Sequence, residues 1–138
     1  MKPRRLFFLI ISVAFFSCNS SRRLDLPQRE MGAMTGNEFY HHVFALDRIQ
    51  REELAKNEIL KGNIPGFLKK FVKIKTSIKS ADGQIIHAYY FALPDYLSIG
   101  SDEDFARIPL TPMTAQYIAD SLHCFLPTRK MVNDIYRA

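Results

Sequence analysis

Between residues 72 and 79, β-branched residues alternate with lysine and serine in the sequence VKIKTSIK. A two-residue period of this kind is typical of a β-strand with one face in water, so we expect Ile74 and Ile78 to be buried and the lysines to be exposed. The turn signal Ala-Asp-Gly-Gln follows at 81–84, where glycine supplies the positive φ of a tight hairpin. Residues 85–93 are apolar at nearly every position, which predicts an interior strand paired with 72–79.

Residues 37–61 instead repeat apolar residues at helical spacing. At about 100° per residue, one broad arc contains Phe39, Val43, Leu46, Ile49, Leu54 and Leu60. Gly62 then ends the pattern. Because Phe44 and Ile59 lie outside the arc, the segment forms either one helix or two helices with a break near Asp47.

The last third of the chain combines short strands with two helices. Residues 96–99 and 105–110 are predicted strands, and the acidic residues between them form a solvated turn. Thr111 and Pro112 are typical of a helix start, and Pro127 opens a second helical pattern. Helix, strands and then helices is the order of an α+β domain. We therefore predict a small single domain with an N-terminal helix, an antiparallel β-hairpin or small sheet and two C-terminal helices.

The first residues of the chain follow a different pattern. Leu6–Phe16 is an eleven-residue, nearly apolar run that follows three basic residues. A helix that spans a bilayer needs about 20 apolar residues. The run is too short for that, and a charged start before an apolar stretch is typical of a secretory signal. We expect residues 1–17 to be a signal peptide, 18–36 to be a lipidated tether and 37–138 to be a single folded domain.

Phe15-Phe16-Ser17-Cys18 resembles the lipobox of bacterial lipoproteins, in which a small residue precedes a cysteine that is acylated and becomes the first residue after cleavage. Phe15 replaces the preferred leucine, and Phe16 is bulkier than usual. The resemblance implies lipidation of Cys18, with palmitate among the acyl chains, and permanent attachment to a membrane of the cell envelope. Asn19 is not the aspartate of an inner-membrane retention signal, which favours the outer membrane. An ordinary signal peptide with an incidental cysteine is the alternative.

Cleavage after Ser17 changes how the charge of the chain is interpreted. The whole chain has 19 Lys and Arg against 14 Asp and Glu, and 16 against 14 remain once residues 1–17 are removed. A nearly neutral, exported protein is not expected to bind nucleic acid. With Cys18 acylated, Cys124 has no partner for an internal disulfide. About 100 residues must therefore be held together by one apolar core.

Residues 95–136, DYLSIGSDEDFARIPLTPMTAQYIADSLHCFLPTRKMVNDIY, resemble the N-terminal part of a longer, functionally uncharacterised family of secreted bacterial proteins. The shared features are a strand, a helix that starts with Thr-Pro and a helix preceded by Leu-Pro-Thr, in that order. The resemblance covers less than a third of the chain and carries no known active-site residue. Because such relatives continue past this helix, the resemblance implies that the chain is truncated at its C-terminus, as the front part of a larger protein. A complete domain is the alternative.

Three residues are weak candidates for catalysis: His87, His123 and Cys124. His123 and Cys124 are adjacent, but neighbouring side chains on a helix diverge by about 100°. Cys124 between a helix and an apolar stretch fits a small buried hydrophobe better than a nucleophile. His41 and His42 have no partner at the spacing of a metal pair, and the acidic loop lacks EF-hand spacing. We therefore expect no metal and no cofactor.

The lysines between residues 69 and 79 allow two interpretations. They could bind anionic sugars or lipid headgroups, or they could face solvent and protect an edge strand from aggregation. Edge protection is favoured unless a second basic surface lies nearby.

Two classes of function remain. The favoured one is a lipid-anchored cell-envelope protein that binds or scaffolds an envelope protein or glycan through the hairpin edge or the acidic loop. The alternative is the N-terminal part of an envelope hydrolase that acts on peptidoglycan or another cell-wall polymer.

Overall fold

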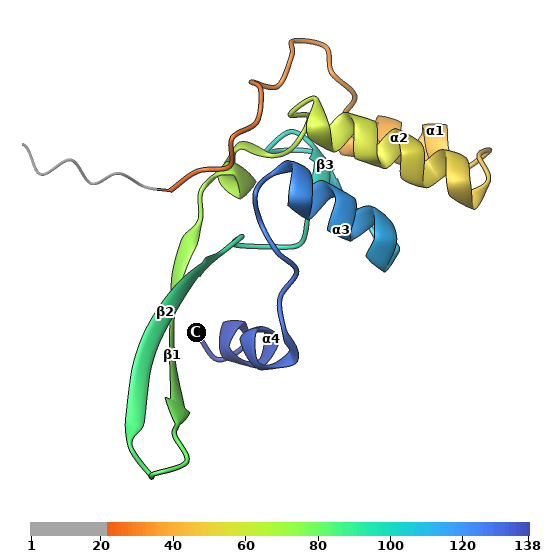
Figure 1. The fold of residues 1–138 in the computed structure, drawn as a ribbon. Helices are drawn as coiled ribbons and strands as arrows, with labels where there is room; N and C mark the ends of the chain where they lie inside the picture. Colours follow the sequence, from red (N-terminus) through yellow and green to blue (C-terminus); the bar gives the residue numbers. More distant parts are fainter. Residues whose placement is uncertain (1–21) are drawn as a thin grey trace, which may run out of the picture.

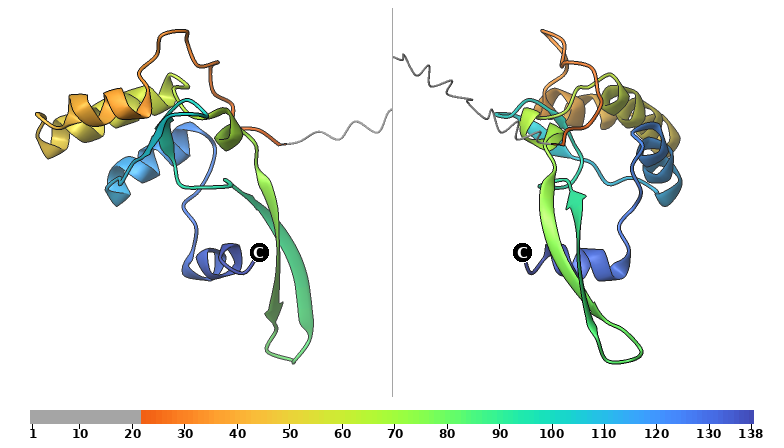
Figure 2. Two further views of the ribbon diagram at one scale, coloured as in Figure 1. Left: turned by 180° about the vertical axis from the view of Figure 1, so that it is seen from behind. Right: turned by 60° about the vertical axis from the view of Figure 1, so that its left-hand side comes forward.

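Three groups of secondary structure make up residues 22–138, the part of the chain that the computed structural model describes (Figure 1). A helical body combines α1 (Gly36–Val43), α2 (Arg48–Leu60) and α3 (Pro112–Ser121) with a short antiparallel sheet of β3 (Ser98–Gly100) and β4 (Phe105–Arg107). The 3-10 helix η1 (Gly66–Lys69) leads from this body into a long hairpin of β1 (Val72–Lys79) and β2 (Ile85–Ala92). The hairpin projects away from the body, and α4 (Arg129–Ile135) lies beside it (Figure 2). This is the small α+β domain that the sequence predicts.

Residues 22–35 pack along the body. Leu24 is 7% exposed within the core, and its backbone N–H donates to the carbonyl of Lys69 at 2.9 Å. Arg23 forms an antiparallel β-bridge with Lys70. The packed part of the chain therefore includes residues that we expected to belong to a tether ending at residue 36. The remaining tether residues, Cys18 and the predicted signal peptide lie outside the described residues.

Two helices occupy the segment 37–61, so the structure has the alternative with a break near Asp47 in place of the single N-terminal helix. The Asp47 carboxylate accepts a hydrogen bond from the backbone N–H of Gln50 at 2.8 Å, while the Gln50 side chain accepts one from the backbone of Asp47. Thr35 and Glu38 form the same reciprocal pair at the start of α1. Such capping boxes satisfy N–H groups that a helix start leaves without partners. The break is therefore set by local side chains.

The predicted hairpin is confirmed, with Ile74 opposite Tyr90 and a φ of +88° at Gly83 in its turn. Ile74 is buried, and the lysines of β1 are exposed as expected. The expectation of an interior β2 strand is wrong, because β1 is the only strand that pairs with β2 in the described part of the chain. Ile86 on β2 is 52% exposed, and Ile78, which we expected to be buried, is 56% exposed.

The hydrophobic core lies where the helices meet the short sheet. Its buried members among the described residues are Leu24, Phe39, Ala55, Ile59, Ile64, Leu68, Ile99, Ala106 and Ile118. The start of α1 approaches this sheet closely, and the Gly36 N–H donates to the carbonyl of Asp104 at 3.1 Å. A Cβ at Gly36 would lie 2.3 Å from the carbonyl carbon of Phe105. Position 36 therefore requires glycine, the residue without a Cβ.

Glu52 holds α3 against α2. Its carboxylate accepts hydrogen bonds from the backbone N–H of Thr111 at 2.9 Å and from the Thr111 hydroxyl at 2.7 Å, and the Thr114 hydroxyl also donates to it. Thr111 is the N-cap of α3 and Pro112 its first residue, as predicted. One carboxylate thus satisfies the cap and fixes the position of the helix.

The attachment of α4 to the hairpin is polar. The Tyr90 hydroxyl donates to the carbonyl of Met131 at 2.9 Å, and the Thr76 hydroxyl donates to the Asp134 carboxylate at 2.6 Å. Lys130 lies 2.7 Å from the same carboxylate. These hydrogen bonds reach Thr76 along β1, and the two isoleucines nearer the turn, Ile78 and Ile86, stay exposed. The end of the hairpin nearest its turn is therefore not covered by α4 in the described structure.

Candidate functional site

The three candidates for catalysis occupy different surroundings. His87 is an exposed residue on β2, opposite Ser77 of β1. His123 is exposed just after α3 and has a φ of +53°. Cys124 is half-buried and packs against the core of the helical body. Among the described residues, no hydrogen bond joins any two of these side chains.

The Cys124 thiol has the environment of a structural cysteine. Its nearest polar partner is the carbonyl of Leu122, at 3.3 Å from Sγ. Burial raises the pKa of the thiol above its usual value. Because the thiolate is the nucleophilic form, this environment lowers reactivity. Cys124 therefore fits the alternative role of a small buried hydrophobe.

The acidic loop between β3 and β4 uses its carboxylates to hold the fold. Asp104 Oδ1 accepts a hydrogen bond from the backbone N–H of Asn37 in the first turn of α1, at 3.0 Å. Asp102 Oδ1 accepts one from the backbone N–H of Phe67 at 3.2 Å. Within residues 22–138, no group of three histidine, cysteine or acidic residues is placed to hold a metal ion. The loop therefore links two neighbouring elements to the short sheet.

A hollow of about 440 Å³ lies beside this loop and is lined by charged residues of both signs. Two of the three basic side chains around it, Lys69 and Arg29, form hydrogen bonds within the protein. Lys69 Nζ donates to the carbonyl of Pro27 at 2.6 Å, and burial followed by the nearby Arg23 lowers the pKa of Lys69. Arg29 donates to Asn63 Oδ1 at 2.9 Å and to the carbonyl of Ala33. These contacts hold residues 22–35 against the body and occupy two of the basic side chains that line the hollow.

The β1–β2 hairpin has two unlike faces because side chains alternate along each strand. One face carries Ile74 and Thr76 and faces α4. The opposite face, here called the outer face, carries three lysines from β1 and mostly aromatic residues from β2. Its members are Lys73, Lys75, Ser77 and Lys79, opposite Phe91, Tyr89, His87 and Ile85 respectively.

Cations and aromatic rings are interleaved on the outer face. Lys73 Nζ lies 3.8 Å from the centre of the Tyr89 ring. Tyr89 and Phe91 meet edge to face with ring centres 5.8 Å apart. The Arg22 guanidinium lies 4.6 Å from the centre of the Phe91 ring. Cation–π contacts of this length are attractive, so the row from Arg22 to Lys73 is held together by its own side chains.

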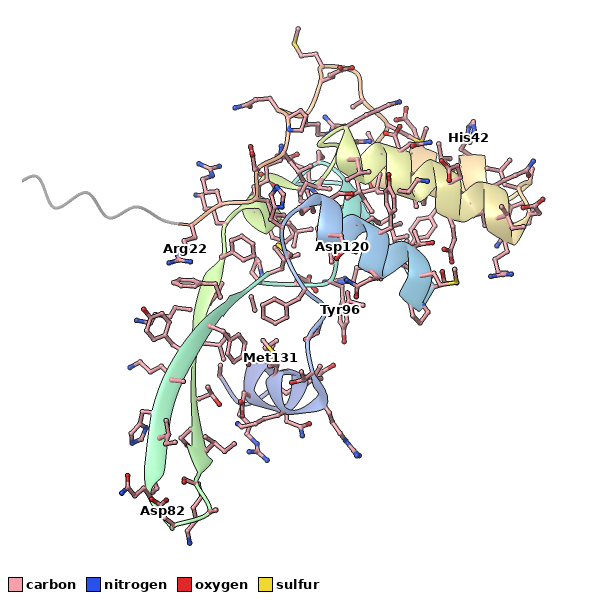
Figure 3. All side chains as sticks on the ribbon, in the orientation of Figure 1. Arg22, His42, Asp82, Tyr96, Asp120 and Met131 are labelled. Carbon is pink, nitrogen blue, oxygen red and sulfur yellow. The ribbon has the colours of Figure 1, made fainter. Side chains whose placement is uncertain are left out.

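Arg22 lies at the base of the hairpin, whereas Asp82 marks its tip (Figure 3). Arg22 adds a fourth basic group to the three β1 lysines of the outer face. It lies on the same face, so it extends the lysine row and is not a second basic surface. Sequence reasoning missed it because Arg22 falls in the segment predicted as tether. The alternation of β2 did contain a usable signal, since Tyr89 and Phe91 had to share one face with the lysines once the register was known.

In residues 22–138, no helix combines the length and the apolar composition needed to cross a bilayer. Cys18 lies outside the described range, and its lipidation stays a prediction. The resemblance of residues 95–136 to secreted bacterial proteins also stays a prediction. No family model, curated protein sequence or solved structure matches the chain, so its function has to be inferred from its own geometry.

Proposed function

We propose that this chain is an exported protein, anchored to the cell envelope by lipid on Cys18, that acts by binding an envelope component. The positive start, the short apolar run and the Ser17-Cys18 pair support the anchor. The β1–β2 hairpin is the binding element. Anchoring and binding together make the protein a fixed docking point on the membrane.

The observation that carries this proposal is the solvent-facing surface of the hairpin. Tyr89 is 57% exposed although it is an aromatic residue in a strand, and Ile85 is 64% exposed. Aromatic residues and arginine are enriched where proteins meet partners, and the outer face carries Tyr89, Phe91 and Arg22. Catalysis has weaker support, because the candidate thiol of Cys124 is half-buried with a raised pKa.

The anchor is tested by metabolic labelling with a fatty acid in the native cells. Label should enter the wild-type protein and be lost in Cys18→Ala, with the chain moving from the membrane fraction to the soluble fraction. Label that survives this substitution would refute the anchor.

The binding element is tested by photo-crosslinking in intact cells. A benzophenone amino acid is placed at Tyr89 or Ile86 on the hairpin and, as a control, at Ile49 on α2, which is 72% exposed. We expect a discrete adduct from the hairpin positions, absent from the control and reduced in Cys18→Ala. Identical products from all three positions, or no product from the hairpin, would refute the hairpin as the binding element.

A further inference from the structure

We propose that the outer face of the hairpin lies against the anionic phospholipid headgroups of the leaflet that holds the acyl chains on Cys18. This inference rests on the proposed anchor, because it takes the distance between Cys18 and the folded domain as its starting point. It adds an orientation to the proposed function: one face of the hairpin is occupied by the membrane, and the distal isoleucines of the opposite face remain available to a partner.

The first step is the length of chain between the anchor and the fold. Arg22 is already fixed to the domain, because its carbonyl accepts a hydrogen bond from the Phe71 N–H at 3.0 Å. Cys18 precedes Arg22 by four residues, and four fully extended residues span at most about 14 Å. A domain attached at Arg22 therefore cannot be lifted far from the bilayer. The base of the hairpin must stay near the headgroups.

The second step is which surface this constraint brings to the membrane. The Arg22 guanidinium stacks on Phe91, which belongs to the outer face. The residue closest to the anchor is thus part of the same row as Lys73 and Tyr89. The hairpin also projects as a ribbon of eight-residue strands, about 27 Å long at the usual rise per residue. Laid along the surface, this ribbon brings Lys79 to the headgroups as well as Arg22.

The third step is charge complementarity. The outer face combines Arg22 with three lysines of β1, and neither strand contains an acidic residue. In the described structure, none of these four basic groups forms a salt bridge with a carboxylate. Each basic residue near an anionic membrane surface strengthens binding about fivefold. The four groups together are therefore a substantial attraction for anionic lipid.

The apolar residues of the same face fit the boundary between headgroups and acyl chains. Tyr89, Phe91 and Ile85 lie on the outer face of β2, opposite Lys75, Lys73 and Lys79 respectively. Aromatic rings are enriched at this depth of a bilayer, where one end of the side chain is apolar and the other is wet. Lysine stems can lie along apolar surface while the ammonium groups reach the phosphates. Membrane contact therefore accounts for residues that edge protection would leave unexplained.

The test uses the acylated protein, purified from its cells and reconstituted in two kinds of vesicle. One kind contains phosphatidylcholine with 30% phosphatidylglycerol, and the other contains phosphatidylcholine alone. Brief labelling of amines followed by mass spectrometry reads the exposure of each lysine. We expect Lys73 and Lys75 to be labelled several-fold more slowly on the anionic vesicles, while Lys61, the C-cap of α2, is labelled equally on both. Equal labelling of Lys73 and Lys75 on the two kinds of vesicle would overturn the proposal.

A second measurement separates headgroup binding from anchoring. The processed chain 18–138 with Cys18→Ser, which contains every core residue of the described structure, is sedimented with the same vesicles. We expect salt-sensitive binding to the anionic vesicles that falls about 25-fold or more in Lys73→Glu/Lys75→Glu. The control Arg48→Glu/Lys61→Glu makes the same change of charge at the first residue of α2 and at its C-cap, and should lose much less. Equal losses in the two double variants, or no preference for anionic vesicles, would contradict a specific outer-face contact.

The two proposals can fail separately. Intact mass of the purified protein reports whether Cys18 is acylated before any vesicle is added, so loss of the anchor is recognised first. A hairpin that forms protein or glycan adducts in cells but shows no anionic-lipid dependence would leave the binding function standing and overturn the membrane-facing orientation.

Discussion

Two isoleucines on the same strand and the same face of the hairpin are expected to differ sharply in their contribution to stability. Ile74 is 5% exposed and lies opposite Tyr90, whereas Ile78 is 56% exposed near the turn. Replacing isoleucine by alanine removes three carbon atoms. At about 0.8 kcal/mol for each buried methylene, Ile74→Ala loses about 2.4 kcal/mol of burial. The residual cavity raises the expected cost to about 3 kcal/mol.

Ile78→Ala is the matched control for this change. Less than half of the Ile78 side chain is buried, so the same removal costs about 1 kcal/mol, and water fills the space without leaving a cavity. For a domain of this size, about 1 kcal/mol corresponds to about 4 °C in Tm. The expected losses of Tm are therefore about 12 °C for Ile74→Ala and about 4 °C for Ile78→Ala.

Circular dichroism during thermal unfolding of residues 18–138 with Cys18→Ser measures both variants. A guanidinium titration then checks that the unfolding slope is unchanged, so that the comparison concerns stability alone. Equal losses of Tm would show that α4 does not cover the Ile74 side of the hairpin, or that the register of β1 is shifted. An equal loss would also remove the basis for assigning the lysines to the outer face.

Three further changes test other contacts. In a denaturant titration, Glu52→Gln should destabilise the domain by about 1–3 kcal/mol, because an amide cannot accept all of the hydrogen bonds from Thr111 and Thr114. The control Glu53→Gln, on the exposed side of α2, should cost less than about 0.5 kcal/mol. The hydrogen bonds from Lys130 and then Thr76 lower the pKa of Asp134. The stability that this carboxylate contributes is therefore present above its unfolded pKa of 3.8 and should be lost as the pH falls through the lower pKa of the folded state. Asp134→Asn should reduce this pH dependence of Tm in thermal melts at different pH. Gly36→Ala should lower the stability by about 2 kcal/mol or more because its Cβ would overlap the Phe105 backbone, while Gly66→Ala should cost less because its Cβ meets only the movable Asp102 side chain. Similar losses of Tm for the two variants would contradict the close approach of α1 to the short sheet.

Features encoded by neighbouring residues could be predicted from the sequence. The Thr111-Pro112 helix start and the turn at Gly83 each depend on contacts within about four residues, and the structure has both. The Asp47 break is equally local, but the sequence left it as one of two alternatives. The alternation of β1 likewise identified which residues share a face. These predictions succeeded because capping and turn geometry are set by short-range chemistry.

Features that depend on distant packing could not be predicted in the same way. An apolar strand such as β2 is typical of an interior position, yet its burial depends on whether a third strand or a helix covers it, and no residue of β2 encodes that. Leu24 occurs in a polar segment with no period, and its burial depends on Lys69 and the surrounding core. The same applies to the candidate site, because the stacking of Arg22 on Phe91 joins positions 69 residues apart.

The polar attachment of α4 has a consequence for how the protein opens. This seven-residue helix contains no buried residue, and side-chain hydrogen bonds to β1 and β2 tie it to the hairpin. Segments with few buried contacts exchange their amide hydrogens through local openings that need much less free energy than global unfolding. Amides of α4 should therefore exchange with deuterium well before those of α2, whose Ala55 and Ile59 lie in the core. The hairpin would then lose the cover of its inner face while the helical body stays folded.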